Sequence, residues 1–541
     1  MKNVKYGKCV RCGKTYDAVP DLTNCECGGI LDIVYDYDYI KSVLTKEKLA
    51  KRENRSMWRY RELLPVEETT PDTPLRVGWS PLYEEPKLAE LLGIKRLWVK
   101  DDGQNPTASL KDRASAMAVA KAMEAGAKTI ACSSTGNAAS SLAGNAAAAG
   151  IKTFIFVPER APQGKVAQLM IFGANVISVK GNYEDTFKMS AAAIDKYGWY
   201  NRNAAINPYL SEGKKTVALE IAEQLNWEMP DYLAISVGDG CTIAGVWKGF
   251  KDLYAIGFID KLPRLISAQS LGCYPINRAI QEDKPWEPME ENTIADSISV
   301  GVPRNADKAL MAIRESNGIA VNVSDEEILA AQRLLGRTCG VFGEPAGVTG
   351  AAALKKACEE GLIPHDATVV SVVTGNGLKD LYAIGFIDKL PRLISAQSTG
   401  CYPINRAIQE NKPWEPMEEN TIADSISVGV PRNADKALMA IRESNGLAIN
   451  VTDEEILAAQ KLLGRTCGVF GEPAGVTGTA AVKKACELGL IEKGATVVSV
   501  VTGNGLKDVA NAIKSAGEPI HIEPDLDLMV EEFKKRGVTV E

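Results

Sequence analysis

The stretch Asn105-Pro-Thr-Ala-Ser-Leu-Lys111-Asp-Arg113 lies where a predicted strand passes into a predicted helix. The apolar run Arg96-Leu-Trp-Val-Lys100 before it is typical of a strand, and the Ala- and Met-rich run from Ala114 to Gly126 after it is typical of an amphipathic helix. A lysine at such a junction lies where a helix N-terminus and loop amides can meet a bound anion. An isolated lysine there is more often an ordinary surface residue, so other motifs must decide its role.

Predicted strands and helices alternate after this stretch. Near-continuous apolar strands between helices indicate a parallel sheet that is covered on both faces. In such sheets, ligands bind beyond the carboxyl ends of the strands. The predicted strands are Lys128–Cys132, Thr153–Val157 and Asn175–Val179, and the predicted helices between them include Ala138–Ala149 and Gln163–Phe172.

Two loops at the predicted strand ends have compositions that suit ligand binding. The loop Cys132-Ser-Ser-Thr-Gly-Asn137 offers hydroxyls and amides that could hold a carboxylate or phosphate, although Ser, Thr and Asn also cap helices. The loop Gly238-Asp-Gly-Cys-Thr242 follows the strand-like run Tyr232–Val237 and precedes a helix. Its glycines would let backbone N–H groups approach a phosphate. It is neither a P-loop nor a G-x-G-x-x-G dinucleotide motif.

Composition excludes several classes of function. The chain carries a net charge of −7, which argues against nucleic acid as the main partner. It contains only two histidines, His365 and His521, so a Ser-His-Asp or Cys-His mechanism and a multi-histidine metal site are disfavoured. No segment is apolar over the length that spans a bilayer, and the N-terminus lacks the apolar core of a signal peptide. We therefore expect a cytoplasmic protein with no membrane partner.

Four of the twelve cysteines lie close together near the N-terminus. Cys9 and Cys12 form a C-x-x-C pair, and Cys25 and Cys27 form a C-x-C pair. Two thiol pairs separated by a short loop indicate a zinc-ribbon-like knuckle with structural zinc. The alternative is four reduced thiols without a metal.

A tandem repeat of 128 residues dominates the second half of the chain. Leu253–Asp380 reappears as Leu381–Asp508, with 12 differences in 128 positions. Each copy contains strand-like runs, which in the first copy are Arg264–Gln269 and Thr368–Thr374. The dipeptide Lys-Asp precedes both copies, at Lys251 and at Lys379, which suggests recombination at these points. The period is too long, and the copies too few, for a solenoid.

Four motifs occur in a fixed order: N-P-T-x-S-x-K-D-R, S-S-T-G-N, G-D-G-x-T and V-V-T-G-N-G-L-K-D. Together with W-R-Y-R-E-L-L-P they resemble the motifs of threonine synthases, which are fold-type II pyridoxal-phosphate enzymes. The resemblance covers essentially the whole chain once one repeat copy is set aside. It implies two parallel-sheet, three-layer α/β domains with pyridoxal 5'-phosphate between them.

The resemblance also implies a division of the chain into segments. These are a zinc-ribbon-like segment (1–55), an arm with the start of the large domain (56–112), a small α/β domain (113–205), a phosphate-loop segment of the large domain (206–252), repeat copy 1 (253–380), repeat copy 2 (381–508) and a C-terminal tail (509–541).

Roles for individual residues follow from the same resemblance. Lys111 would form the Schiff base with the cofactor and shuttle protons, and Asn137 would contact the cofactor's phenolic oxygen. A threonine of V-T-G-N-G, either Thr374 or Thr502, would hydrogen-bond the pyridine nitrogen. The cofactor's phosphate would be held by Gly238, Asp239, Gly240, Cys241 and Thr242. The substrate carboxylate would be held by Ser133, Ser134 and Thr135.

One segment departs from the family pattern. Asn207-Pro-Tyr-Leu-Ser-Glu-Gly-Lys-Lys-Thr216 resembles N-P-x-R-x-E-G-Q-K-T, in which the arginine helps to bind the substrate phosphate. Leucine or serine stands in its place here. Lys214, Lys215 or Arg202 could compensate.

The implied reaction converts O-phospho-L-homoserine and water to L-threonine and phosphate, in a homo-oligomeric enzyme. A serine or threonine dehydratase would use the same lysine, asparagine and glycine loop. A non-enzymatic scaffold remains an alternative if the duplication destroys the active site, and the reading frame could also be a recombination product.

One cofactor needs only one V-T-G-N-G threonine, so one of the two repeat copies is surplus at each active site. The surplus copy would expose strand edges and apolar helix faces.

Overall fold

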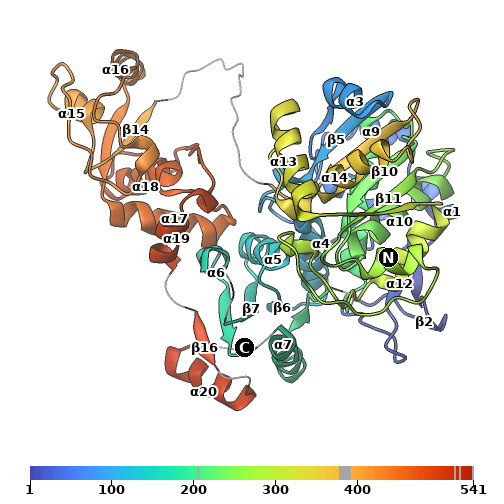
Figure 1. The fold of residues 1–541 in the computed structure, drawn as a ribbon. Helices are drawn as coiled ribbons and strands as arrows, with labels where there is room; N and C mark the ends of the chain where they lie inside the picture. Colours follow the sequence, from blue (N-terminus) through green and yellow to red (C-terminus); the bar gives the residue numbers. More distant parts are fainter. Residues whose placement is uncertain are drawn as a thin grey trace. The chain divides into compact units, whose positions relative to one another are not determined.

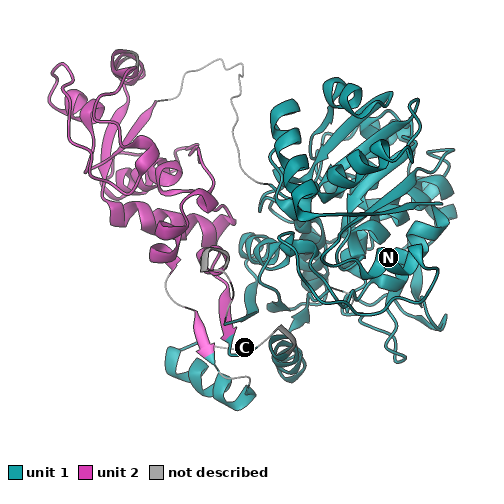
Figure 2. Ribbon diagram, viewed as in Figure 1, with its two compact units in different colours: residues 1–159, 179–377, 522–541 teal, residues 160–178, 378–521 magenta. Residues whose placement is uncertain are grey.

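The structure is a computed structural model that describes residues 1–159, 161, 163–181, 183–204, 206–376, 392–516, 519–522 and 525–538. The junction between the repeat copies, from Lys379 to Leu381, lies outside these residues. The chain forms two compact units, which Figure 2 colours separately. Unit 1 comprises residues 1–159, 179–377 and 522–541, and unit 2 comprises residues 160–178 and 378–521. No helix in the described ranges is long and apolar enough to cross a membrane.

Unit 1 begins with a small sheet in the order β2-β1-β3, formed by Thr15–Tyr16, Val4–Cys9 and Leu31–Tyr35. Helices α1 (Tyr37–Val43) and α2 (Lys46–Ala50) follow. The predicted arm contains the 3-10 helix η1 (Met57–Leu63), whose Met57, Trp58 and Tyr60 are buried. This N-terminal segment is therefore packed onto the rest of unit 1 through apolar side chains.

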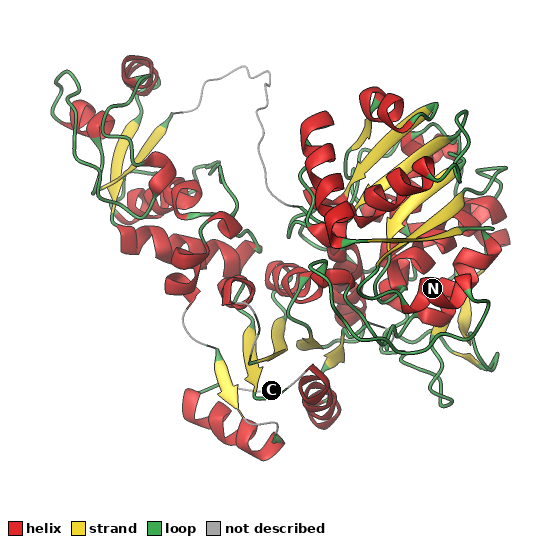
Figure 3. Ribbon diagram, in the orientation of Figure 1, coloured by secondary structure: helices red, strands yellow, loops and turns green. Residues whose placement is uncertain are grey.

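A six-stranded sheet forms the centre of unit 1, and its strands are among those drawn yellow in Figure 3. Their order is β12-β11-β10-β13-β5-β4. All neighbouring pairs are parallel except β4 and β5. The strands are Ile319–Val323 (β12), Arg264–Ser270 (β11), Tyr232–Ser236 (β10), Thr368–Val373 (β13), Arg96–Asp101 (β5) and Leu82–Glu84 (β4). Strands β11, β12 and β13 all belong to repeat copy 1.

Successive side chains of the central strands enter two different cores. In β13, Val370 and Val372 lie in one apolar cluster, whereas Val369 and Val373 lie in the other. This alternation follows from the two-residue period of a strand that is buried on both faces. Four helices pack directly on the strands, namely α3 (Pro86–Leu92), α11 (Pro275–Gln281), α12 (Ala306–Glu315) and α14 (Pro345–Glu359). Helices α9 (Thr216–Gln224), α10 (Cys241–Ala255) and α13 (Asp325–Thr338) pack on neighbouring helices.

A second parallel sheet in unit 1 has β6 (Thr129–Ser133) between β7 (Lys152–Pro158) and β9 (Tyr200–Asn201). Helices α4 (Lys111–Glu124) and α5 (Asn137–Ala148) pack on each other, and α7 (Tyr183–Tyr197) packs on β6 and β7 (Figure 1). The C-terminal helix α20 (Leu526–Arg536) packs on α7. Helix α8 (Tyr209–Lys214) packs on α4, and the chain returns to the central sheet through α8 and α9. The predicted fold class, α/β with two parallel sheets, is confirmed.

Unit 2 contains most of repeat copy 2. Its strands β14 (Ile394–Ser398) and β15 (Leu447–Val451) are parallel and reproduce the pairing of β11 with β12. Four of its helices repeat α11, α12, α13 and α14 of copy 1, namely α15 (Pro403–Gln409), α16 (Ala434–Glu443), α17 (Asp453–Cys467) and α18 (Pro473–Glu487). Helices α17 and α18 pack on a core of their own. Helix α19 (Val509–Ala516) follows copy 2, and α6 (Gln163–Ile171) packs on α17 and α19. Strands β8 (Asn175–Val179) and β16 (Ile520–Ile522) lie at the boundaries between the units in the chain.

One strand expected in copy 2 does not form. The sequence Thr368–Val373 makes β13 in copy 1, but the identical residues 496–501 have no strand structure. Val498 is 83% exposed, whereas its counterpart Val370 is 0% exposed. The physical reason is that β5 and β10, the partners of β13, exist once in the chain. The prediction of a strand in each copy is therefore wrong for copy 2.

Candidate active site

A cavity of about 530 Å³ lies within unit 1 at the carboxyl ends of β5, β6, β10 and β13. This is the place where ligands bind in parallel α/β sheets. The predicted site residues among its lining are Lys111, Ser133, Ser134, Thr135, Asn137, Lys214, Gly238, Asp239, Gly240, Cys241, Thr242 and Thr374. The fold thus brings together five segments that are far apart in sequence.

Lys111 is the first residue of α4, and the loop before it is held by copy 1. The backbone N–H of Leu110 donates to the carbonyl of Thr374 at 2.9 Å, and that of Asn376 donates to the carbonyl of Ala108 at 3.0 Å. Ala108 has φ of +65°, a left-handed conformation that costs a non-glycine residue about 1 kcal/mol. The V-T-G-N-G segment of copy 1 is therefore a direct support for the lysine loop.

The two residues after Lys111 fix the start of α4. Asp112 accepts hydrogen bonds from the backbone N–H and the hydroxyl of Thr107, both at 2.8 Å. Arg113 is buried and donates to Asp102 at 2.7 Å and to Glu220 at 2.5 Å. The K-D-R motif thus consists of one residue that faces the cavity and two that anchor it.

The electrostatic surroundings of Lys111 favour a neutral amine. Burial lowers the pKa of Lys111 to about 8, and the positive charges of Lys214 and Arg202 act in the same direction. The carboxylate of Glu344 acts in the opposite direction. A lysine with such a pKa is partly deprotonated at neutral pH and can act as a nucleophile or a base.

The glycine loop has the geometry of an anion cradle. Gly240 has φ of +88° and precedes α10, whose first turn presents backbone N–H groups to the cavity. A side chain at Gly240 would lie 2.9 Å from the carbonyl oxygen of Asn305, and one at Gly238 would lie 2.8 Å from the Cα of Ile298. Both positions require glycine because the backbone of copy 1 packs against them.

The remaining residues of this loop have distinct surroundings. The carboxylate of Asp239 accepts hydrogen bonds from the backbone N–H of Arg304 at 2.8 Å and from the side-chain amide of Asn305 at 3.0 Å. Asp239 therefore ties the cradle to copy 1. The thiol of Cys241 lies 3.3 Å from the hydroxyl of Ser211, and Thr242 is buried at the cavity wall.

The Ser133–Asn137 loop forms the opposite wall. The backbone N–H of Ser133 donates to the side chain of Asn203 at 2.8 Å, and the backbone N–H of Ser134 donates to the carbonyl of Phe156 at 3.1 Å. Asn137 begins α5 and donates from Nδ2 to Oε1 of Glu344 at 2.6 Å. Asn137 lines the cavity, and its Nδ2 also donates to the hydroxyl of Ser297 at 3.3 Å.

The two candidate threonines are not equivalent. Thr374 lies at the end of β13 and lines the cavity, whereas Thr502 is not among the lining residues. Copy 1 also contributes Ser297, Arg304 and Glu344 to the lining.

One predicted substrate residue needs correction. Lys214 lines the cavity, but its neighbour Lys215 does not. The ammonium of Lys215 pairs with Glu212 at 2.7 Å and with Asp252 at 2.6 Å, and it lies 3.8 Å from the ring centroid of Tyr35. Adjacent helical residues point about 100° apart, so only one of the two lysines can face the cavity. Lys215 is part of a buried ion network.

Glu344 and Arg304 are among the cavity residues that were not predicted from the sequence. Glu344 precedes Pro345 at the start of α14, which from sequence indicates only a helix N-terminus. Arg304 lies in a loop with no recognisable motif. Neither residue carries a local signal that distinguishes it from a surface charge.

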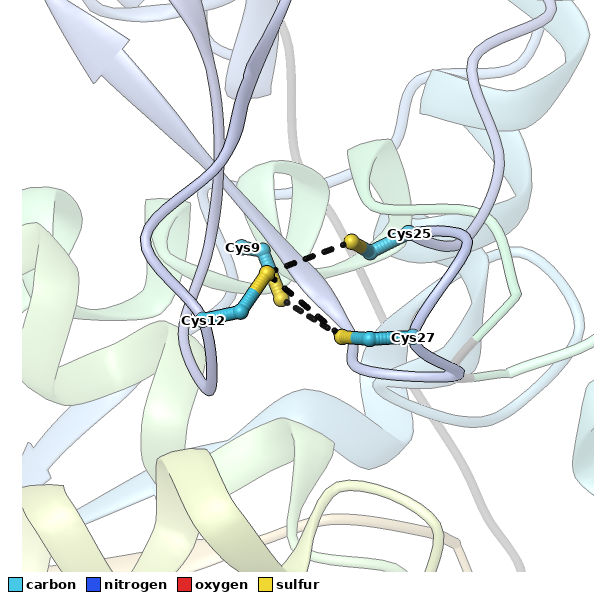
Figure 4. Close-up of side chains that lie close together, drawn as sticks. All are labelled: Cys9, Cys12, Cys25 and Cys27. Atoms are coloured by element: carbon cyan, nitrogen blue, oxygen red, sulfur yellow. Dashed lines mark hydrogen bonds between the residues drawn. The ribbon is translucent and has the colours of Figure 1, made fainter.

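The four N-terminal cysteines converge, as Figure 4 shows. The Sγ atoms of Cys12 and Cys25 are 3.5 Å apart, and Sγ of Cys27 is 3.6 Å from those of Cys9 and Cys12. Tetrahedral zinc with Zn–S bonds of about 2.3 Å requires S···S distances of about 3.8 Å. The arrangement therefore fits a four-thiolate zinc site.

Comparison with known proteins gives consistent matches. The family model for "Pyridoxal-phosphate dependent enzyme" matches residues 74–375 and 377–503. Threonine synthase of Methanocaldococcus jannaschii is 45% identical over 378 residues, which cover 69% of this chain and 92% of that protein. Threonine synthase of Methanosarcina acetivorans is 42% identical over 393 residues, covering 72% and 96%. The solved structure of maize serine racemase has a TM-score of 0.49 and 23% identity, covering 56% of this chain and 88% of that chain.

Proposed function

Because the chain belongs to the threonine synthase family of pyridoxal-phosphate dependent enzymes, we propose that it converts O-phospho-L-homoserine and water to L-threonine and phosphate. The observation that carries the proposal is the cavity in which Lys111, with its lowered pKa, lies among the glycine cradle and Asn137. Each of these groups suits a different part of the cofactor. The proposed substrate is a small molecule, with neither nucleic acid nor membrane as a partner.

The lining of the cavity suits pyridoxal 5'-phosphate in its donor chemistry. The cradle at Gly238–Thr242 would hold the phosphate with backbone N–H groups at the start of α10. Asn137 would donate to the phenolic oxygen, Thr374 would meet the pyridine nitrogen, and Lys111 would hold the cofactor through its amine. When bound, the cofactor supplies an electron sink for carbanion chemistry.

The chain's own residues would then bind the substrate and move its protons. Ser133, Ser134 and Thr135 would hold the carboxylate with hydroxyls and amides. Lys111 would take a proton from the α carbon and then one from the β carbon. Phosphate leaves with the electrons of the Cγ–O bond, and the γ carbon gains a proton and becomes the methyl group. Water then adds its hydroxyl to the β carbon, and the α carbon regains a proton. A base of pKa about 8 suits such transfers at neutral pH.

Release of inorganic phosphate tests the proposal directly. Purified protein with added cofactor should release one phosphate for each threonine formed. Lys111→Ala should reduce turnover by about 1,000-fold or more, because it removes both the base and the cofactor's attachment. The visible absorbance of bound cofactor should disappear in the same variant. Deamination of serine or threonine without any release of phosphate from phosphohomoserine would instead support a dehydratase.

We also propose that Cys9, Cys12, Cys25 and Cys27 bind one structural zinc ion, which implies a reducing compartment such as the cytoplasm. Metal analysis should give about one zinc per chain in the native protein and none after Cys9→Ser/Cys27→Ser. Zinc content unchanged in that variant would contradict the assignment.

We propose a homo-oligomeric state as well, since Val498 and Val500 of copy 2 are exposed apolar side chains that association could cover.

A further inference from the structure

The residues that occupy the position of the family's phosphate-binding arginine carry no positive charge in this chain, so they cannot bind the substrate phosphate in the same way. Leu210 and Ser211 occupy the corresponding place, and both are buried in α8. The hydroxyl of Ser211 lies 3.3 Å from the thiol of Cys241. A phosphorylated substrate must therefore find its cationic partner elsewhere on the cavity wall.

Arg304 lies on that wall and is held in place from two sides. Its backbone N–H donates to Oδ1 of Asp239 at 2.8 Å, which fixes it beside the glycine cradle. Its guanidinium carbon lies 3.6 Å from the ring centroid of Phe187, another lining residue. Stacking on an aromatic ring orients the guanidinium plane and leaves its edge N–H groups available. Within the described ranges, the guanidinium has no carboxylate partner.

The other cations of the cavity have different surroundings. Lys111 is the proposed cofactor-binding amine. Arg202 is buried and donates to the hydroxyl of Ser115 at 3.2 Å from two of its nitrogens. Lys214, the last residue of α8, is buried. It lies beside Gly245, which belongs to the first turns of α10, next to the cradle for the cofactor's phosphate. Arg304 is the cation that the cavity wall offers to a second anion.

We propose that Arg304 binds the phosphate group of the substrate and sets the preference for a phosphorylated amino acid. This inference rests on the proposed function. A planar guanidinium can donate two parallel N–H···O bonds to a phosphate dianion. It would also stabilise the negative charge that develops on the leaving phosphate when the Cγ–O bond breaks.

Repeat copy 2 provides a matched control for this residue. Arg432 lies in the same sequence, Val-Pro-Arg-Asn-Ala-Asp-Lys, as Arg304. It is exposed, belongs to unit 2 and is not among the lining residues of the cavity. A substitution at Arg432 therefore makes the same chemical change without touching the proposed site.

Binding of inorganic phosphate to the holoenzyme tests the proposal independently of turnover. With cofactor bound, the glycine cradle is filled, so calorimetric titration with phosphate at constant ionic strength reports a second anion site. Arg304→Met should weaken phosphate binding by about 10- to 100-fold, the loss expected for charge-assisted hydrogen bonds. It should raise KM for O-phospho-L-homoserine by a similar factor, with cofactor absorbance unchanged. The phosphate affinity and KM of Arg304→Lys should lie between those of the native protein and Arg304→Met. Both values for Arg432→Met should stay within about twofold of those of the native protein.

The outcomes separate this inference from the proposed function. Native protein that turns over phosphohomoserine, together with unchanged phosphate affinity and KM in Arg304→Met, would overturn the role of Arg304 alone. Native protein that binds phosphate through Arg304 but does not act on phosphohomoserine would support the anion site and refute the reaction. Equal losses in Arg304→Met and Arg432→Met would also overturn the inference, because only one of the two residues lines the cavity.

Discussion

Repeat copies 1 and 2 are nearly identical in sequence but differ in what surrounds them. In copy 1, Thr368–Val373 lies between β5 and β10 as a buried strand. In copy 2, the same six residues form no strand, and residues 496–500 are exposed. By contrast, helices α13 and α17 begin with the same capping box, at Ser324 and at Thr452. Helices close their hydrogen bonds locally, whereas a central strand depends on neighbours that the chain supplies once.

The same contrast extends to the cavity. Glu344 of copy 1 accepts a hydrogen bond from Asn137, whereas its counterpart Glu472 lies 3.6 Å from Lys507 within unit 2. Thr374 accepts from the lysine loop through its carbonyl, and Thr502 lies outside the cavity lining. Copy 2 thus keeps the local conformation of a site wall without the rest of the site. Paired substitutions at equivalent positions can measure this difference.

The largest expected difference concerns the strand itself. Val370→Asp should destabilise unit 1 by more than about 4 kcal/mol, because it buries an unpaired charge between β5 and β10. Val498→Asp should change stability by less than about 0.5 kcal/mol, because its site is exposed. Retention of cofactor during urea titration measures both. Comparable losses in the two variants would mean that the copies share the central position in the sheet.

The second pair concerns the predicted contact with the pyridine nitrogen. Thr374→Ala should lower kcat/KM by about 10-fold, the cost of one lost hydrogen bond. Thr502→Ala should remain within about twofold of the native enzyme. Steady-state phosphate release gives both values. Equal losses would be evidence against the assignment of copy 1 to the site.

The third pair concerns the protonation of Lys111. Glu344 raises the pKa of Lys111, which burial holds at about 8, so Glu344→Gln should lower this pKa further. Only the neutral amine attacks the cofactor aldehyde, so cofactor uptake by the apoprotein should rise with pH and level off above the pKa of Lys111. The midpoint should move to lower pH in Glu344→Gln and stay in place in Glu472→Gln. An upward shift in Glu344→Gln would contradict the electrostatic role of Glu344.

The smallest effect is expected where the N-terminal segment meets copy 1. Arg11 pairs with Asp307 at 2.7 Å, and both side chains are partly exposed. Asp307→Asn should therefore cost no more than about 1 kcal/mol, and Asp435→Asn, at the exposed equivalent position, should cost nothing measurable. Thermal unfolding of the two variants at low salt measures the difference between their losses of stability. The difference should shrink at high salt, and a salt-independent loss would point to another cause.

Much of unit 1 could be predicted from sequence, because its strands are apolar runs bounded by clear breaks. Residues 96–101 and 152–158 form strands where expected, and α5 begins one residue before the predicted helix. The resemblance identified Lys111, the glycine cradle and the Ser133–Asn137 loop, all of which line the cavity. Motifs that join a strand to a helix place their residues at the sheet edge, which is why they were predictable.

The errors and omissions arise where long-range packing decides the outcome. Lys214 and Lys215 are indistinguishable by sequence, and only the packing of α8 selects which one faces the cavity. Arg304 and Glu344 come from loops that reach the site through the tertiary fold. Residues 368–373 and 496–501 are identical, so no property of the segment could predict that only one becomes a strand.

The return of the last helix determines how copy 2 is attached to the chain. Helix α20 packs on α7 in unit 1, and the rings of Phe533 and Phe154 lie 5.4 Å apart. Both ends of copy 2 therefore lead back into unit 1, which makes the copy an internal cassette with two anchors. A single backbone cleavage inside the cassette would leave the two fragments associated through α20. Gain or loss of the whole cassette in frame would alter neither terminus of the enzyme unit.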